Sequence, residues 1–436
     1  MERQERIRIF SLASAFFCVQ ACYTILRELR DSLFIALVGK AYIQYAQLGS
    51  MLILIPAIFL YSRLVDRYAQ HQLVYGYAIF FAVGSLVCAW CIRTMHPVGL
   101  AGWILYVFVE SYAPFMISLL FAYINSVTPP HSAPQTYALV MLGSKFGGAL
   151  SAMLSWQFLL MSPYHEEIHH RILLFVAGCW VACVPLCIFY ARRILSERYL
   201  HGYEASYRVN AHEKKMHEHD PWYARLLTGL TLMGRYPYIL GIFGLVCAWE
   251  MIHVVINFHR LCVGTEICAT TTDLSIFLFK QIFWVHVVGI VVAASVRDCM
   301  AWLGERVTLM LAPCLTALLL VGYFMSSWAS LVMVCYVLIR AINYSLSVSV
   351  REALYIPTTK DVRFKSKSWI DVFGTKAARG SGALYNLGTQ IFTRSSIKIA
   401  SFLVCMGITG LWIVIASVLG KKFESTIRSN QVIGEM

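Results

Sequence analysis

A cluster of charged residues lies inside an apolar stretch near the N-terminus of the chain. The apolar sequence runs from Ile9 to Tyr23, is followed by four charged residues between Arg27 and Asp31, and continues to Val38. A charge at the centre of a bilayer costs about 2.5–3.5 kcal/mol on insertion scales, so such residues usually face a polar cavity or one another. The stretch therefore predicts a membrane helix with a group of charges inside it.

Two interpretations of this cluster stay open from the stretch alone. Arg27, Arg30 and Asp31 have the i, i+3, i+4 spacing that places them on one helical face. Two guanidinium groups facing a shared cavity would suit an anionic substrate. If the helix enters the bilayer near Ile9, however, Arg27 lies about 27 Å along it at ~1.5 Å per residue. That position is close to the far interface, where an arginine can reach water.

The composition is that of a helical membrane protein. Hydrophobic residues make up 59% of the 436 residues and charged residues only 14%, and the mean hydropathy is +0.65. Many apolar runs are long enough to cross a hydrocarbon core of about 30 Å as helices. We therefore expect an all-α polytopic membrane protein rather than a soluble domain with one anchor.

The apolar runs predict twelve transmembrane helices in a six-plus-six arrangement. Their approximate bounds are 9–38, 44–62, 72–93, 99–127, 136–160, 171–191, 236–258, 274–296, 307–325, 328–350, 378–394 and 397–419. The first is a candidate for a bend or break at its charges, and the eleventh is weak because it is rich in glycine and serine. We predict an N-terminal half at 1–191, a charged cytoplasmic linker at 192–235, a C-terminal half at 236–420 and a cytoplasmic tail at 421–436.

Lysine and arginine orient the predicted helices. They gather before the first span, after the second, sixth and tenth spans, and at the C-terminus. With twelve spans all these segments lie on one side, so the positive-inside rule places both termini in the cytoplasm. We expect a multi-pass protein of the inner (cytoplasmic) membrane whose first span is not cleaved as a signal peptide. The net charge of +13 belongs to these loops, so no nucleic-acid partner is expected.

The loop after the second predicted span resembles a motif of the major facilitator transporters. Residues 62–68 carry Asp66 and Arg67 as the motif does, although its glycines are missing. The equivalent loop of the second half contains Arg297-Asp298 and Gly304-Glu305-Arg306 as a weak counterpart. An ordinary charged turn is the alternative interpretation. Together with the six-plus-six division, the loop predicts a major-facilitator-like fold.

Further charged residues fall inside predicted spans of both halves. They are Glu110, Lys145, Glu250, His253, Lys280 and Arg340. A structural salt bridge explains one such residue, but charges of both signs in both halves favour a solvated central cavity. Its basic groups would offset the charge of an anion, and Glu110, Glu250 or His253 could bind a proton or form a gating salt bridge. Gly143, Gly147 and Gly148 around Lys145 would let another helix approach closely.

The cysteines and the absent motifs argue against other chemistry. Most of the 14 cysteines lie in apolar runs, where packing is favoured over metal or redox roles. Cys262 and Cys268 fall in one predicted external loop, where a disulfide is an open alternative. The sequence contains no G-x-x-x-x-G-K-[ST] loop and no G-x-S-x-G elbow. We expect neither an enzyme nor a bound cofactor or metal.

Short motifs between the first and eleventh spans occur in a characteristic order. They are Tyr-Thr-Ile-Leu-Arg-Glu-Leu-Arg-Asp at 23–31, Glu110 followed by Ser-Leu-Leu-Phe at 118–121 and Asn125, Arg-Glu-Ala-Leu-Tyr-Ile-Pro at 351–357, Lys365-Ser366-Lys367, Ile-Asp-Val-Phe-Gly at 370–374, and Arg379-Gly380-Ser381-Gly382. In this series the chain resembles the non-mitochondrial ATP/ADP antiporter (nucleotide transporter) family of plastids and obligate intracellular bacteria. The resemblance implies a facilitator-like twelve-helix fold and nucleotide transport, with Arg30, Glu110 and Arg351 in the places of the family's essential charges.

The chain departs from that family in two respects. Family lysines are arginines at Arg30, Arg351 and Arg379, which keeps the charge but changes its geometry. An essential glutamate of the seventh span falls on His253, with Glu250 one turn earlier as a substitute. Exchange of ATP for ADP, transport of other nucleotides and transport of NAD therefore all stay open.

We predict a secondary transporter that moves nucleotides, of the ATP/ADP exchange type, by alternating access. The candidate substrate-binding residues are Arg27, Arg30, Glu110, Lys145, Arg351 and Arg379, and the candidates for coupling or gating are Asp31, Glu250, His253 and Lys280. Tyr112 and Tyr385 are candidates to stack on a base. The expected partners are a nucleotide or another anionic small molecule and the lipid bilayer, with a monomer favoured. The alternatives are a proton-coupled importer of a nucleotide, NAD or another organic anion, and a non-transporting membrane scaffold or sensor.

Overall fold

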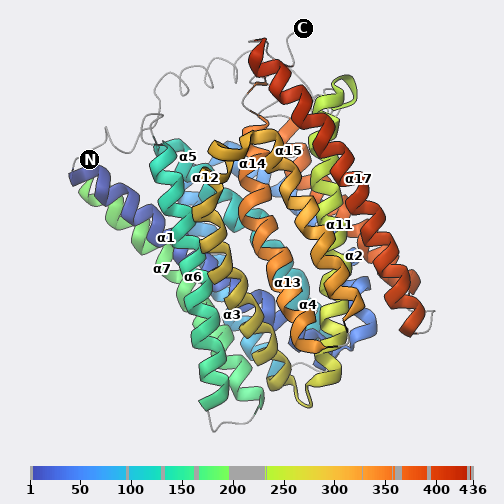
Figure 1. Cartoon of the computed structure of the whole chain (residues 1–436). Helices are drawn as coiled ribbons and strands as arrows, with labels where there is room; N and C mark the ends of the chain where they lie inside the picture. The colour runs from blue at the N-terminus through green and yellow to red at the C-terminus, as the bar shows by residue number, and fades with distance from the viewer. Residues whose placement is uncertain are drawn as a thin grey trace. The chain divides into compact units, whose positions relative to one another are not determined.

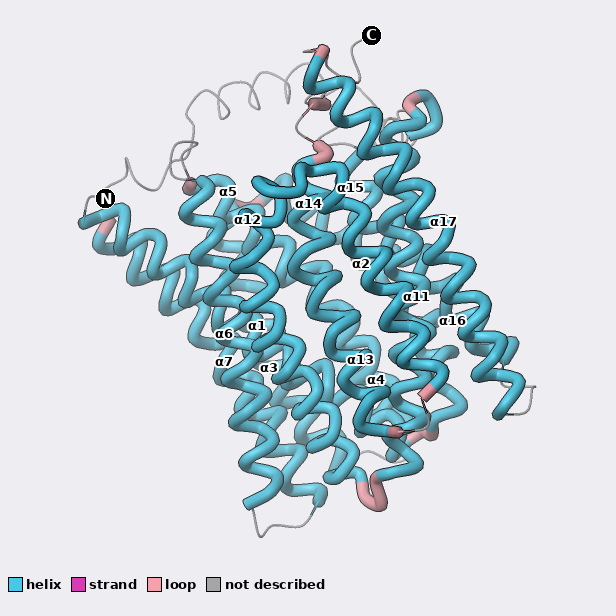
Figure 2. The backbone as a smooth tube through the Cα atoms, viewed as in Figure 1, coloured by secondary structure: helices cyan, strands magenta, loops and turns pink. Residues whose placement is uncertain are grey.

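The computed structural model describes most of the chain as helices (Figure 2). The described residues are 3–94, 98–128, 133–161, 166–195, 231, 233–326, 328–355, 357–358, 366–389, 394–429 and 433. Within these residues the only bridge between extended backbone segments pairs Thr358 with Ile433. The predicted all-α class is therefore confirmed.

The helices are labelled in chain order in Figure 1. Before the predicted linker they are α1 (Arg3–Leu37), η1 (Lys40–Tyr42), α2 (Ile43–Arg67), α3 (Gln70–Thr94), α4 (Val98–Tyr112), η2 (Ala113–Ile117), α5 (Ser118–Val127), α6 (Ala133–Met161) and α7 (Glu166–Ile194). After it they are α11 (Pro237–Ile267), α12 (Thr271–Met325), α13 (Ala329–Ile342), η4 (Asn343–Ser347), α14 (Val348–Ala353), α15 (Lys367–Trp369), η6 (Ile370–Gly374), α16 (Thr375–Thr389) and α17 (Arg394–Arg428).

The described parts of the predicted spans are almost entirely helical, whereas residues 390–393 of the eleventh lie outside the described residues. Ten of these helical segments are long and apolar enough to cross a membrane. The other two predicted spans are α2, with 25 residues, and α16, whose 15 residues are fewer than the about 20 that a bilayer requires. The break considered for the first span does not occur, because α1 runs without interruption through its charged cluster.

The chain forms two compact units that are not two consecutive halves. The first unit comprises Met1–His217 and Gly264–Val287, and the second comprises Glu218–Val263 and Val288–Met436. The beginning of α12 thus packs with the first unit although it follows the linker in sequence. Most of the linker lies outside the described residues, so its predicted bounds stay a prediction.

In the first unit, α1 packs against α4, α6 and α7 (Figure 1). The close approach predicted for the small residues of α6 is confirmed. A Cβ atom at Gly143 would lie 2.8 Å from the carbonyl oxygen of Ala13, and one at Gly147 would lie 2.3 Å from that of Phe17. A larger residue at Gly147 would therefore push α1 away from α6.

In the second unit, the buried core gathers aromatic and aliphatic side chains of α11, α12, α13 and α17, including Trp249, Tyr323, Tyr336 and Trp412. Gly304 kinks α12 with a φ of 75°, a left-handed conformation that glycine adopts without steric cost. This kink separates the eighth and ninth predicted spans.

The described residues contain three π turns, of which η2 and η4 lie at corresponding positions of the two units. η2 continues α4 into α5, and η4 continues α13 into α14. Pro114 lies in η2 and cannot donate a backbone hydrogen bond, which explains a local departure from the α-helical pattern there. Such π turns often occur at functional sites, and a charged residue, Glu110 or Arg340, precedes each of these two.

Candidate functional site

A buried ion-pair cluster in the first unit joins α1 to α4. The Arg30 Nε and Nη2 atoms donate to Asp31 Oδ1 at 2.8 and 2.6 Å, and Arg30 Nη1 donates to Glu110 Oε1. The guanidinium carbon also lies 4.6 Å from the ring centroid of Tyr106. Arg30 is 7% exposed and Asp31 is 2% exposed. Protein groups rather than water therefore satisfy Arg30.

The charge of Arg30 stabilises those of Asp31 and Glu110 and is stabilised by them, so the loss of one member destabilises the cluster. One guanidinium group holds two carboxylates in a largely water-excluded setting. Removing one member of a buried ion pair leaves an uncompensated charge and typically costs about 3–5 kcal/mol. An anion that binds Arg30 has to compete with Glu110, which is the more exposed of the two carboxylates. Glu110 is thus the partner that an anion can most readily replace.

A second group of the predicted residues meets in the second unit. Arg379 Nε, on α16, donates to Glu250 Oε2 on α11 at 2.7 Å. The Nδ1 atom of His253 lies 3.9 Å from the same carboxylate oxygen, and its ring stacks on Trp249 with centroids 5.5 Å apart. The side chain of Arg379 is 25% exposed, so water screens this pair more than it screens the Arg30 cluster.

Arg351 lies at the end of α14 beside a separate charged group. Its side chain is half-buried. The neighbouring Glu352 forms an ion pair with Lys367 of α15, and the Lys367 ammonium lies 5.3 Å from the ring centroid of Tyr355. These contacts bring together two motifs, at 351–357 and 365–367, that are apart in sequence.

The remaining predicted residues differ in their burial. Lys280 is exposed, with its ammonium 6.0 Å from the ring centroid of Trp156, and Arg27 and Lys145 are half-buried. Tyr112 is fully buried, and its hydroxyl donates to the carbonyl oxygen of Val19 at 3.0 Å. A base cannot stack on Tyr112 in this arrangement.

Sequence reasoning missed a second arginine cluster. Arg260 Nη1 of α11 and Arg340 Nη1 of α13 both donate to the hydroxyl oxygen of Tyr336, each at 2.7 Å. The Tyr336 hydroxyl in turn donates to Asn257 Oδ1 at 3.1 Å. Both arginines are 1% exposed. Arg340 stood out in the sequence as a charge within a span, but its partner Arg260 did not.

A polar network in the first unit also escaped the sequence analysis. Ser275 Oγ, near the start of α12, donates to Ser32 Oγ at 2.8 Å and lies 2.9 Å from His170 Nε2. Further along α12, His286 Nε2 lies 3.5 Å from Thr24 Oγ1. These contacts tie the beginning of α12 to α1 and α7, which explains why residues 264–287 belong to the first unit.

Two sequence features carry no metal or redox chemistry in the described residues. Residues 165–169 have the letters of an H-E-x-x-H zinc motif, but His165 is outside the described residues and His169 packs edge-on to Phe158 at 5.9 Å. The described part of the chain contains no group of three metal ligands. Cys262 lies in α11 rather than in the predicted loop, and neither it nor Cys268 forms a disulfide there. Burial raises the pKa of the Cys268 thiol, which disfavours the reactive thiolate.

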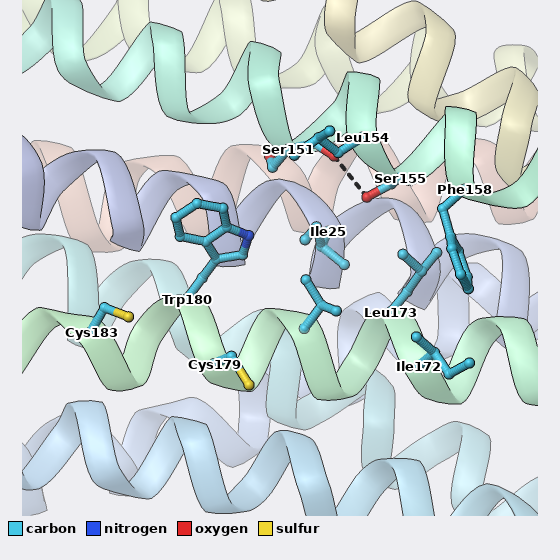
Figure 3. A pocket seen from close by; sticks show the side chains of 11 residues that line it. Ile25, Ser151, Leu154, Ser155, Phe158, Ile172, Leu173, Cys179, Trp180 and Cys183 are labelled. Carbon is cyan, nitrogen blue, oxygen red and sulfur yellow. Dashed lines mark hydrogen bonds between the residues drawn. The ribbon is translucent and has the colours of Figure 1, made fainter.

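A pocket of about 390 Å³ lies between α1, α6 and α7 of the first unit (Figure 3). Its lining is almost entirely apolar and includes Ile25, Phe158 and Trp180. The Ser155 hydroxyl, which lies at this pocket, donates to the carbonyl oxygen of Ser151 at 2.7 Å. No charged side chain lines the pocket, so it is not a site for an anionic substrate.

Comparison with known proteins gives one family match and a set of full-length relatives. Residues 327–423 match the family described as TLC ATP/ADP transporter. The chain is 23% identical to "ADP,ATP carrier protein 1" of Chlamydia pneumoniae, over 98% of this chain and 94% of that protein. It is 20% identical to "ADP,ATP carrier protein 4" of Rickettsia conorii, over 99% and 94% of the two chains. These relatives are transporters, in agreement with the prediction that the chain is not an enzyme.

Solved structures of secondary transporters share the fold. The structure of a D-xylose-proton symporter covers 96% of this chain and 97% of its own, with a TM-score of 0.59 and 15% identity. A bacterial homologue of the human lysosomal transporter Spinster covers 100% of both chains, with a TM-score of 0.54 and 12% identity. The predicted major-facilitator-like fold is confirmed at the level of architecture.

Proposed function

Because the chain is a divergent relative of the TLC ATP/ADP transporters with a secondary-transporter fold, we propose that it moves nucleotides across a membrane by alternating access. The proposed reaction is exchange of ATP for ADP. The chain is a multi-pass membrane protein. We extend the proposal to an inner-membrane location, cytoplasmic termini, a monomeric state and halves divided at 192–235, on the basis of charge distribution and the predicted span count.

The observation that carries this proposal is the buried pair between Arg30 and Glu110. Guanidinium binds phosphate with the same paired geometry with which it binds carboxylate. A phosphate group can therefore replace Glu110 as the partner of Arg30 without leaving that guanidinium unpaired. Since the pair joins α1 to α4, replacing Glu110 releases one helix from the other and links substrate binding to a change of conformation.

A second candidate function is proton-coupled import of a nucleotide, NAD or another organic anion. It is favoured by His253, which lies 3.9 Å from the Glu250 carboxylate. Histidine gains and loses a proton near neutral pH, so this pair has the chemistry of a proton carrier. Import driven in this way needs no nucleotide on the opposite side of the membrane.

Uptake of radiolabelled ATP into intact bacterial cells that express the chain tests both candidates. After loading, the cells are chased with unlabelled ATP, ADP, GTP or NAD outside. Exchange predicts rapid release of label, and the most effective chase compound identifies the exchange partner. Retention of label together with loss of uptake on addition of an uncoupler would favour proton-coupled import. No uptake, with the protein shown to be in the membrane, would overturn nucleotide transport.

A further inference from the structure

The two units repeat the same arrangement of arginine and tyrosine. Arg260 and Tyr336 lie 230 positions after Arg30 and Tyr106, and the π turn η4 lies 230 positions after η2. The guanidinium carbon is 4.6 Å from the tyrosine ring centroid in the first unit and 4.9 Å in the second. Helix α1 thus places an arginine on a tyrosine of α4, and α11 places one on a tyrosine of α13.

The charge that completes each arrangement differs. The residue 230 positions after Glu110 is Arg340. Glu110 accepts a hydrogen bond from Arg30, whereas Arg340 donates to the same tyrosine hydroxyl as Arg260. A carboxylate in the first unit is therefore replaced by a second guanidinium in the second unit.

Arg340 has no carboxylate partner among the described residues. The structure gives it the Tyr336 hydroxyl and two aromatic rings, with centroids 5.5 Å away at Tyr336 and 5.4 Å away at Tyr344. Its Nε atom is buried and forms no hydrogen bond. The arginine is only 1% exposed, so water does not provide the missing negative charge.

Arg340, which lacks a carboxylate partner among the described residues and shares the Tyr336 hydroxyl with Arg260, favours an anion with several charges. Tyr336 gives each arginine a single hydrogen bond to an uncharged acceptor. A pyrophosphate group offers several charged oxygens and can accept paired hydrogen bonds from each guanidinium. The tyrosine hydroxyl holds the two guanidinium groups close together, which suits neighbouring phosphates.

We propose that Arg260 and Arg340 form the subsite that binds the polyphosphate of the substrate. The proposal rests on nucleotide transport as the function and assigns the phosphate charge to a pair of arginines in the second unit. Recognition then depends on the number of phosphates, so di- and triphosphates bind and nucleosides do not. Arg30 joins α1 to α4, and an anion reaches it only by replacing Glu110.

The test measures the Tm of the purified full-length protein in detergent as inorganic pyrophosphate, ATP or adenosine is added. The variants are Arg340→Gln, Tyr336→Phe and the control Arg306→Gln, whose side chain is 41% exposed and lies 3.7 Å from Glu424. Pyrophosphate and ATP should raise the Tm of the unmodified protein, and adenosine should not. Arg340→Gln should weaken pyrophosphate binding about tenfold or more, and Arg306→Gln should change it less than about twofold.

Tyr336→Phe separates a binding role from a purely structural one. Without anion this variant should melt at a lower temperature, because both guanidinium groups lose an acceptor. Its affinity for pyrophosphate should fall about threefold or more, since the hydroxyl no longer holds the two guanidinium groups together. A purely structural role predicts the lower Tm with an unchanged affinity for pyrophosphate. This variant also keeps the proposal testable if Arg340→Gln does not fold.

Three outcomes distinguish the subsite from the proposed function. Equal pyrophosphate affinity in Arg340→Gln and the unmodified protein overturns the subsite, even when ATP uptake is observed. The absence of any shift with pyrophosphate in the unmodified protein overturns it as well. If pyrophosphate stabilises the unmodified protein and Arg340→Gln abolishes this effect, the subsite is supported. If ATP uptake is absent in the same protein, nucleotide transport is disproved while the subsite stands.

Discussion

The two arginine–tyrosine arrangements differ in how their charge is balanced. In the first unit Arg30 is held by Asp31 and Glu110, so its charge is compensated within the protein. In the second unit Arg340 and Arg260 share the hydroxyl of Tyr336. The geometry is repeated, but Glu110 of the first unit is replaced by Arg340 in the second, which indicates that the two units have different functions. The first closes an ion pair between helices, and the second presents positive charge to an anion.

The largest effect is expected from Arg30→Ala. This change leaves Asp31 and Glu110 buried without their shared cation and should lower the free energy of unfolding by about 3–5 kcal/mol. ATP uptake should fall to background in intact cells, with the amount of protein in the membrane measured alongside. The control is Arg428→Ala, whose side chain is 78% exposed and should leave uptake unchanged. Normal uptake by Arg30→Ala would remove this arginine from the mechanism.

Arg340→Glu tests whether charge is the difference between the two units. The introduced carboxylate lies beside Arg260, as Glu110 lies beside Arg30, so the second unit should acquire a buried ion pair. We expect the free energy of unfolding to rise by about 1.5–3 kcal/mol, as for hydrogen bonds to charged groups. ATP uptake should nevertheless be lost. Thermal melting and cellular uptake measure the two effects, and a stable variant with full uptake contradicts the comparison.

Gly147→Ala tests how α1 is held in the first unit. The added Cβ atom would lie 2.3 Å from the carbonyl oxygen of Phe17, so α1 has to shift and the cost should be about 1–3 kcal/mol. Gly410→Ala on α17 is the matched control, because no atom lies within 4 Å of its Cβ position. Its stability should change by less than about 1 kcal/mol. Equal melting temperatures of the two variants would show that the close α1–α6 contact at Gly147 does not contribute to the stability of the protein.

The smallest effect is expected from His253→Gln. His253 lies 3.9 Å from Glu250 and packs on Trp249, whereas Arg379 directly pairs with Glu250. If the reaction is exchange, no proton is required and ATP uptake should change less than about threefold. The same uptake and chase measurement applies. Loss of ATP uptake in this variant, with the protein shown to be in the membrane, would favour the proton-coupled alternative.

The sequence predicted which charged residues lie within the membrane spans and belong to the candidate site. Arg30, Asp31 and Glu110 stood out because charges are costly in apolar spans, and the structure unites them although Glu110 is 80 positions from Arg30. Glu250, His253 and Arg379 likewise come together. Arg260 escaped because it lies near the predicted end of its span, where an arginine is ordinary. Comparing positions 230 residues apart would have drawn attention to it.

The sequence by itself determined where the helices lie. In a bilayer every backbone polar group must be paired within its own segment, so an apolar run of sufficient length becomes a helix whatever its neighbours are. The approximate positions of the predicted spans follow from this local rule.

Only the tertiary structure decided which charges are paired and where the beginning of α12 packs. Ion pairs and shared hydrogen bonds depend on which helix faces meet, and distant sequence positions do not encode that meeting locally. Arg30 and Arg260 occupy equivalent places, yet one meets a carboxylate and the other a second arginine. Their different electrostatics therefore arise from Asp31, which follows Arg30 in sequence, and from the residues that α4 and α13 place beside each arginine.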